Sequence, residues 1–173
     1  LRRVQAHEDE VNGIAISLDN KRMLTGSNDS TIKLWDFESL ELQKTFSDHT
    51  RAVRSVTFSD KGDQILSGSD DQTVKLWDLQ GNILLTIEAH ANEVRSVEFS
   101  QDMKKILTSS ADNTAKIWDM KGQLLRLLSG HQKYLRSAYF SPKGDKIVTA
   151  SGDQFALIWP STESIYTWLR DSD

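Results

Sequence analysis

The sequence predicts an all-β fold built from four copies of one structural unit. Its four histidines are separated by 42, 41 and 41 residues. Each is followed by an aspartate 22 residues later and by a tryptophan 28 residues later. A locked period near forty residues indicates that one supersecondary unit has been repeated. In chain order, the four sets are His7, Asp29 and Trp35; His49, Asp71 and Trp77; His90, Asp112 and Trp118; and His131, Asp153 and Trp159.

The unit that begins at His49 shows why each element is expected to be a strand. Short runs rich in Val, Ile, Phe and Trp alternate with turns that contain Gly, Asp and Asn, which is strand-and-turn chemistry. The expected elements are a strand at 53–58, a turn at 60–63, a strand from 65, a turn at 70–72, a strand at 74–77, a turn at 80–82 and a strand at 83–87. Four short strands per unit predict the blade of a β-propeller. One blade cannot bury both of its faces, so neighbouring blades must stack.

The repeated segments resemble WD repeats over residues 1 to about 160. They read LTGSNDSTIKLWD, ILSGSDDQTVKLWD, ILTSSADNTAKIWD and IVTASGDQFALIWP. The resemblance implies a buried hydrogen-bonded chain of His, Ser or Thr, Asp and Trp in each blade, because each buried polar group needs a partner. The implied sets are His7, Thr25, Asp29 and Trp35; His49, Ser67, Asp71 and Trp77; His90, Thr108, Asp112 and Trp118; and His131, Thr149, Asp153 and Trp159.

Two departures from the family pattern concern positions outside these chains. The family often has Gly before the histidine, and here only Gly130 keeps it. Trp159 is followed by Pro160 where the family has Asp. The four-residue chain of the fourth blade is therefore still expected, whereas the segment after it is open to question.

The predicted organisation is four blades followed by a tail. The blades are expected at about 7–46, 49–87, 90–128 and 131–159. Residues 1–4 align with the fourth strand of the other units and form a spare outer strand, which in similar rings completes the last blade and covers its edge. The tail, 161–173, is expected to form a short helix because Ile165, Trp168 and Leu169 have helical spacing after capping Ser and Thr residues. A displaced outer strand is the alternative.

Three arrangements of the ring stay open, since propellers close with about 4 to 8 blades. In the first arrangement, the sequence is part of a longer propeller whose other blades lie in the same longer chain. Alternatively, two copies form a homodimer that completes an eight-bladed ring. In the third arrangement, one chain closes alone.

Composition bounds the function classes. The formal net charge is −4 over 173 residues, so nothing global indicates a nucleic-acid or membrane partner. The absence of cysteine excludes thiol chemistry and fits a reducing, cytoplasmic location. We expect no cofactor and no metal, because the histidines lie one per blade and cannot converge on one ion.

Candidate partner-binding residues are expected at the top face, the mouth of the central channel. By resemblance, the position five residues after each histidine points there, and three of the four residues at that position are arginines. An arc of arginines suits bidentate contact with the carboxylates of a protein or acidic peptide. The alternative is that the arginines pair with nearby carboxylates or are solvated. The candidate residues are Arg54, Arg95, Arg136, Asn12, Glu10, Glu93, Tyr134 and Asp70.

The predicted function is a non-enzymatic scaffold for protein or peptide interaction. A hydrolytic triad needs one exposed nucleophile beside an oxyanion hole, whereas this His, Asp and hydroxyl set occurs four times, each with a Trp partner. Similarity to the regular propellers of bacterial signalling proteins gives an alternative, a sensor propeller that gates an NTPase module in a multidomain chain.

Overall fold

The chain folds into four antiparallel sheets in a computed structural model, which describes residues 2–161. Within that range every regular element is a strand. Blade 1 contains β1 (Val11–Ile16), β2 (Arg22–Ser27), β3 (Ile32–Asp36) and β4 (Leu42–Phe46). Blade 2 contains β5 (Val53–Phe58), β6 (Gln64–Ser69), β7 (Thr73–Asp78) and β8 (Ile83–Glu88). Blade 3 contains β9 (Val94–Phe99), β10 (Lys105–Ser110), β11 (Thr114–Asp119) and β12 (Leu124–Ser129), and blade 4 contains β13 (Leu135–Phe140), β14 (Lys146–Ser151) and β15 (Ala156–Pro160).

Each sheet is a meander whose second and third strands are joined by the same strained turn. The residue after the turn aspartate has a positive φ in every blade, between 68° and 78°. This conformation is uncommon for residues other than glycine. The aspartate stabilises it by accepting the backbone N–H two residues later, as Asp71 does from Thr73. The four positive-φ residues are Ser30, Gln72, Asn113 and Gln154.

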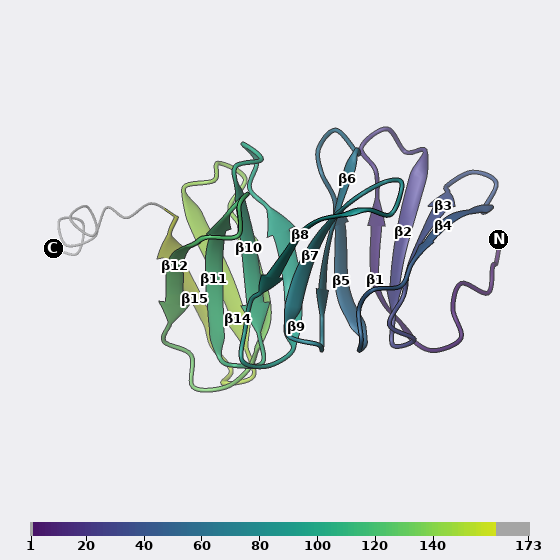
Figure 1. The fold of residues 1–173 in the computed structure, drawn as a ribbon. Coiled ribbons are helices and arrows are strands. Elements are labelled where there is room, and N and C mark those ends of the chain that lie inside the picture. Colours follow the sequence, from purple (N-terminus) through teal and green to yellow (C-terminus); the bar gives the residue numbers. More distant parts are fainter. Residues whose placement is uncertain (1, 162–173) are drawn as a thin grey trace, which may run out of the picture.

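The blades stack in sequence order into an open arc. β1 packs on β5, β5 on β9, and β9 on β13. In Figure 1 the N-terminal segment lies beside blade 1 at one end of the arc, and β15 lies at the other end. The first strand of each blade is therefore the inner strand, and β4, β8 and β12 are the outer strands.

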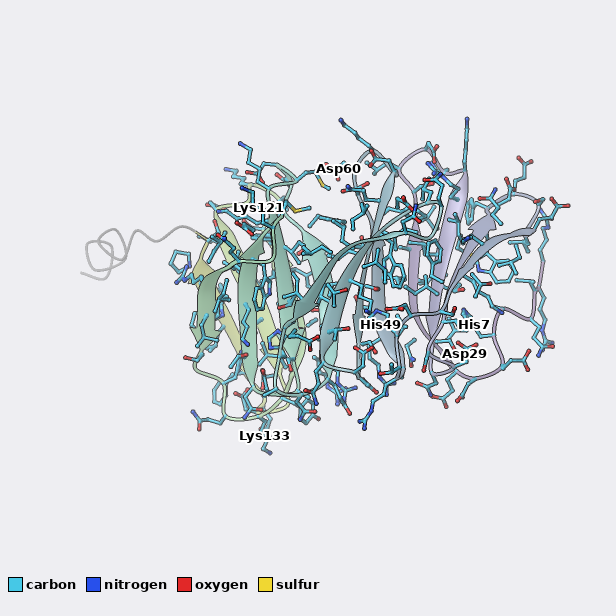
Figure 2. The ribbon with its side chains drawn as sticks, viewed as in Figure 1. His7, Asp29, His49, Asp60, Lys121 and Lys133 are labelled. Atoms are coloured by element: carbon cyan, nitrogen blue, oxygen red, sulfur yellow. The ribbon has the colours of Figure 1, made fainter. Side chains whose placement is uncertain are left out.

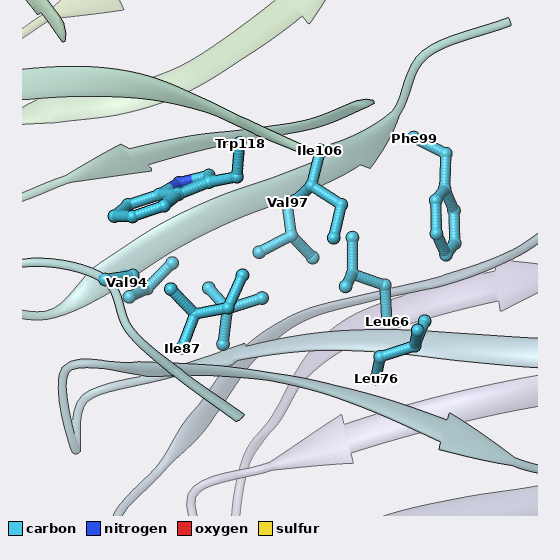
Figure 3. Close-up of a cluster of buried hydrophobic side chains, with 10 residues drawn as sticks. Leu66, Leu76, Ile87, Val94, Val97, Phe99, Ile106 and Trp118 are labelled. Atoms are coloured by element: carbon cyan, nitrogen blue, oxygen red, sulfur yellow. The ribbon is translucent and has the colours of Figure 1, made fainter. Parts of the chain in front are cut away.

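Separate apolar cores fill the spaces between neighbouring blades. Between blades 2 and 3, Leu66, Leu76 and Ile87 pack against Val94 and Val97, together with Phe99, Ile106 and Trp118 (Figure 3). One face of each blade thus presents residues of its second, third and fourth strands, and the next blade presents residues of its first, second and third strands. The same arrangement repeats between blades 1 and 2 and between blades 3 and 4.

The all-β prediction of antiparallel propeller blades is confirmed, with departures at the ends. Blade 4 has three strands within the described residues, because no segment there pairs with the outer side of β15. Residues 2–4 form no strand, since β15, the edge that they were expected to cover, lies at the opposite end of the arc. Residues 2–161 of a single chain form an open arc, with β1 and β15 at opposite ends. The expected helix falls in 162–173, outside the described residues.

Candidate functional site

The four predicted hydrogen-bonded chains are all present, one in each blade. In blade 2, Nδ1 of His49 lies 2.7 Å from the Asp71 carboxylate and Nε2 lies 2.7 Å from Oγ of Ser67. The indole N–H of Trp77 donates to the same Oγ at 2.9 Å. The corresponding bonds in the other blades measure 2.7–3.0 Å, through Thr25, Thr108 and Thr149 in place of Ser67. The chain links the loop before each inner strand to the second and third strands.

The protonation pattern of each chain follows from its partners. A carboxylate only accepts hydrogen bonds, so Nδ1–H of each histidine donates to the aspartate. Burial lowers the pKa of His90, and this outweighs the opposing effect of Asp112. The neutral ring then accepts the Thr108 hydroxyl proton at Nε2.

The carboxylates of the four chains are held in the ionised form. Burial alone would raise the pKa of Asp29, but hydrogen bonds from Thr31, His7 and the Glu8 N–H lower it to about 2. The pKa values of Asp71, Asp112 and Asp153 are lowered in the same way against the effect of burial. The chains are therefore charge-stabilised structural elements.

A threonine that the sequence analysis missed belongs to three of these chains. The hydroxyl of Thr73 donates to Asp71 at 2.7 Å, and Thr31 and Thr114 do the same in blades 1 and 3. Its signal in the sequence is a threonine two residues after the turn aspartate in three of the four units. In blade 4 this position is Phe155, so the fourth aspartate lacks that donor.

This arrangement suits architecture, not hydrolysis. Oγ of Ser67 accepts from an indole and is hydrogen-bonded to an imidazole, and the serine is fully buried. A substrate carbonyl has no access to it. Among residues 2–161, no group of three His, Asp or Glu residues could hold a metal ion. No helix in the described part of the chain has the length and apolarity needed to cross a bilayer.

The predicted top-face residues do gather at one end of the sheets. Figure 2 shows Lys133, in the loop before β13, at one end, and Asp60 and Lys121, in hairpin turns, at the other. Backbone bonds join that loop to the turn between the second and third strands, for example from Asp70 N–H to Ala52 O at 2.9 Å. Equivalent bonds occur in all four blades. The loops and turns selected from the sequence thus form one face, which we call the top face.

Two of the three arginines are paired with carboxylates, as the alternative interpretation expected. Nε of Arg54 donates to Asp70 at 2.8 and 3.0 Å, and these bonds raise the pKa of the guanidinium. Nη1 of Arg54 donates to Oδ1 of Asn12 at 3.2 Å and of Asn28 at 3.1 Å. Arg95 pairs with Glu93. These contacts fix the orientation of the guanidinium groups and offset part of their charge.

Arg136 differs from the other two arginines. It forms no ion pair with any described residue, donates to the Tyr134 hydroxyl at 3.1 Å and lies 5.3 Å from the centre of that ring. Glu10 accepts a long bond of 3.4 Å from Asn28 and does not reach an arginine. The positive charge of the top face is therefore least compensated at blade 4.

The same residues line a hollow of about 370 Å³ at the top face. The sequence analysis selected every lining residue except Leu135, whose side chain is buried. The lining residues are Asn12, Arg54, Arg95, Tyr134, Leu135 and Arg136. A concave surface that combines guanidinium donors with one aromatic ring can hold an anionic group.

The repeats match one protein family over most of the chain. The WD40 family (WD domain, G-beta repeat) matches residues 1–36, 40–78, 81–119 and 122–160. This chain belongs to the WD40 family. The second, third and fourth matched repeats each begin with the outer strand of one blade and end with the third strand of the next, so the family repeat and the structural blade are offset by one strand.

Curated relatives share a shorter segment with this WD40 chain. It is 44% identical over 55 residues to the nuclear distribution protein nudF of Aspergillus flavus, and 42% identical over 55 residues to the nuclear distribution protein PAC1 of Arthroderma otae. It is 37% identical over 60 residues to the nuclear distribution protein nudF 2 of Penicillium rubens. These matches cover 32–35% of this chain and 12–13% of the relatives. The repeats and the relatives together support a protein-interaction scaffold.

Proposed function

We propose that this WD40 chain is a non-enzymatic scaffold whose top face binds an acidic segment of a partner protein. The observation that carries the proposal is the hollow lined by Arg54, Arg95 and Arg136, in which Arg136 has no carboxylate partner among the described residues. A rigid stack of sheets holds these side chains in place, which favours binding through loops. The sensor alternative stays a prediction, because no feature of the described residues bears on an NTPase module.

The three arginines are expected to contribute unequally to binding. Arg54 is anchored by Asp70 and Asn12, so it shapes the hollow more than it attracts a ligand. Arg136 can offer its guanidinium to a carboxylate without first breaking an ion pair, and the Tyr134 ring supports its plane. An acidic peptide should therefore depend most strongly on Arg136.

Binding of a fluorescent hexaglutamate peptide, measured by anisotropy, tests this proposal. We expect Arg136→Ala to weaken binding about fivefold and Arg95→Ala to weaken it less. Binding should also weaken as salt is raised from about 50 to about 500 mM. Lys121→Ala removes the same charge at the opposite face (Figure 2) and serves as the control. Equal binding by Arg136→Ala and Lys121→Ala would contradict the proposal.

A further inference from the structure

Two apolar faces, one at each end of the arc, are the largest unexplained feature of the described structure. The start face consists of Val11, Ile14 and Ile16 of β1, and the end face of Tyr139, Val148 and Ile158 of blade 4. All six residues are exposed. Their equivalents inside the arc are mostly buried. Ile14 is 65% exposed and Ile158 is 56% exposed, whereas the corresponding Val56 and Ile117 are 5% and 2% exposed.

We propose that the end face of one chain binds the start face of a second copy, and that two copies close head to tail into one ring. Inside each chain, the end-type face of one blade packs on the start-type face of the next. The two exposed faces are the two halves of that same repeating interface. A head-to-tail contact forms a ring when its rotation closes.

One hydrogen bond crosses the interface between blades 2 and 3, and an equivalent bond crosses the interface between blades 3 and 4. The end face carries the next acceptor of this series. Val97 N–H donates to Ser55 Oγ at 3.2 Å, and Ala138 N–H donates to Ser96 Oγ at 3.0 Å. The next acceptor in this series is Ser137, and the next donor is the N–H of Ile14 in the second copy. Sequence periodicity thus supplies both partners of a bond that one chain alone does not make.

The N-terminal segment is held where an outer strand of a preceding blade would lie. Arg2 donates to the carbonyls of Glu38 and Ser39, the latter at 3.0 Å. Lys33 Nζ donates to Ala6 O at 2.6 Å, as Lys116 does to the carbonyl that follows β8. Residues 2–4 therefore lie against blade 1 where the outer strand of a preceding blade would lie. The inner strands of such a blade are not among the described residues of this chain.

Blade 4 of a second copy supplies those inner strands. β15 has an open edge among the described residues, and an open edge is a template for pairing. In blade 3 the outer strand pairs Leu128 with Ala115 and Leu127 with Lys116. The same register places Val4 of one copy opposite Ala156 of the other, and Arg3 opposite Leu157. Each copy gives one strand and receives one.

One position of the proposed interface is glycine in blades 1 and 2 and a larger residue, Ser109 or Ala150, in blades 3 and 4. A Cβ atom at Gly26 would lie 2.8 Å from Val53 Cγ1, and one at Gly68 would lie 2.7 Å from Val94 Cγ1. The equivalent end-face residue is Ala150, which would meet Val11 of the second copy. Ser109 is fully buried at the same position between blades 3 and 4, so a Cβ at Ala150 is compatible with the interface.

Disulfide trapping tests the pairing, because the chain has no cysteine. The double variant Arg3→Cys with Leu157→Cys places the two thiols opposite each other on neighbouring strands. After oxidation we expect one covalent species of twice 19.6 kDa on a non-reducing gel, without a ladder. Arg3→Cys with Ile158→Cys is the control, since a one-residue slip turns the side chain to the opposite face. A ladder of longer species, or equal trapping by the control, would overturn the closed pair.

Light scattering of the unmodified chain provides an independent measurement. We expect a dimer mass, and Ile14→Glu should raise the dimer dissociation constant more than about tenfold because it buries a charge in the interface. Leu127→Glu, at an exposed position of an outer strand, should leave the mass unchanged. A monomer at all concentrations would overturn the proposal. This outcome leaves the peptide-binding proposal standing.

Discussion

Blades 2 and 4 contain the same hydrogen-bonded chain in different surroundings. The His–Asp distance is 2.7 Å in both blades, and both tryptophans donate at 2.9 Å. Blade 2 has a neighbour on each face, and Trp77 is 2% exposed. Within residues 2–161, blade 4 has one neighbour and three strands, and Trp159 is only partly buried. The geometry of the hydrogen-bonded chain is thus local to a blade. The burial of its tryptophan follows the outer strand, since blade 1 also has one neighbour but has four strands, and its Trp35 is 3% exposed.

Removal of the tryptophan should show the largest difference between the two blades. Trp77→Ala should lower the free energy of unfolding by about 3–5 kcal/mol, since it empties a fully packed site where the indole meets Phe46 edge-on at 5.6 Å between ring centres. Trp159→Ala should cost less in the monomer, because part of the indole is already solvated. Urea unfolding followed by circular dichroism measures both. Equal losses would show that the outer strand does not contribute to this site.

Removal of the aspartate should lower the free energy of unfolding less than removal of the tryptophan, again more in blade 2 than in blade 4. Asp71→Ala should lower the free energy of unfolding by about 1–3 kcal/mol, because His49 and Thr73 lose their acceptor. Asp153→Ala should cost less, since Phe155 replaces the threonine donor in blade 4.

Thermal melting measures both aspartate variants. Asp60→Ala is the control, since this aspartate lies in an exposed hairpin turn (Figure 2). If Asp71→Ala melted like the control, the hydrogen-bonded chain of blade 2 would have no structural role.

Periodicity made the blades predictable from the sequence. The strand expected at 53–58 and that expected at 83–87 match β5 and, to within one residue, β8. The residues of the hydrogen-bonded chains could be selected from the sequence because their spacing is fixed relative to turns and strands that recur four times. Thr73 escaped notice because the implied pattern had only four members, although its position recurs in three units.

Side-chain partners at the top face could not be predicted in the same way. Spacing placed Arg54 and Arg95 on one face, but whether they face a ligand or a carboxylate depends on contacts between neighbouring blades. Arg54 reaches Asn12 of blade 1, a contact 42 residues away in the sequence. Ring closure was likewise left open, since it depends on surfaces that no single repeat contains.

The smallest expected effect is the loss of stability in acid, which comes from the aspartates of the four hydrogen-bonded chains. Their pKa values are lowered in the folded state, to about 2 for Asp29 against 3.8 when unfolded. The unfolded state therefore binds protons first, and stability is lost as the pH falls from about 4 towards 2. The pKa of His90 is lowered from 6.5 by burial, so its contribution is lost as the pH falls below that value.

The free energy of unfolding in urea, measured at pH 7, 5, 4 and 3, follows both contributions. Asp71→Asn should flatten the decline below pH 4, because the amide cannot be protonated there. Asp60→Asn should leave the dependence of the unfolding free energy on pH unchanged, since that carboxylate lies in an exposed turn outside the hydrogen-bonded chains. An unchanged slope in Asp71→Asn would mean that this aspartate has the same pKa in the folded and unfolded states. In that case the network of blade 2 would be held by hydrogen-bond geometry alone.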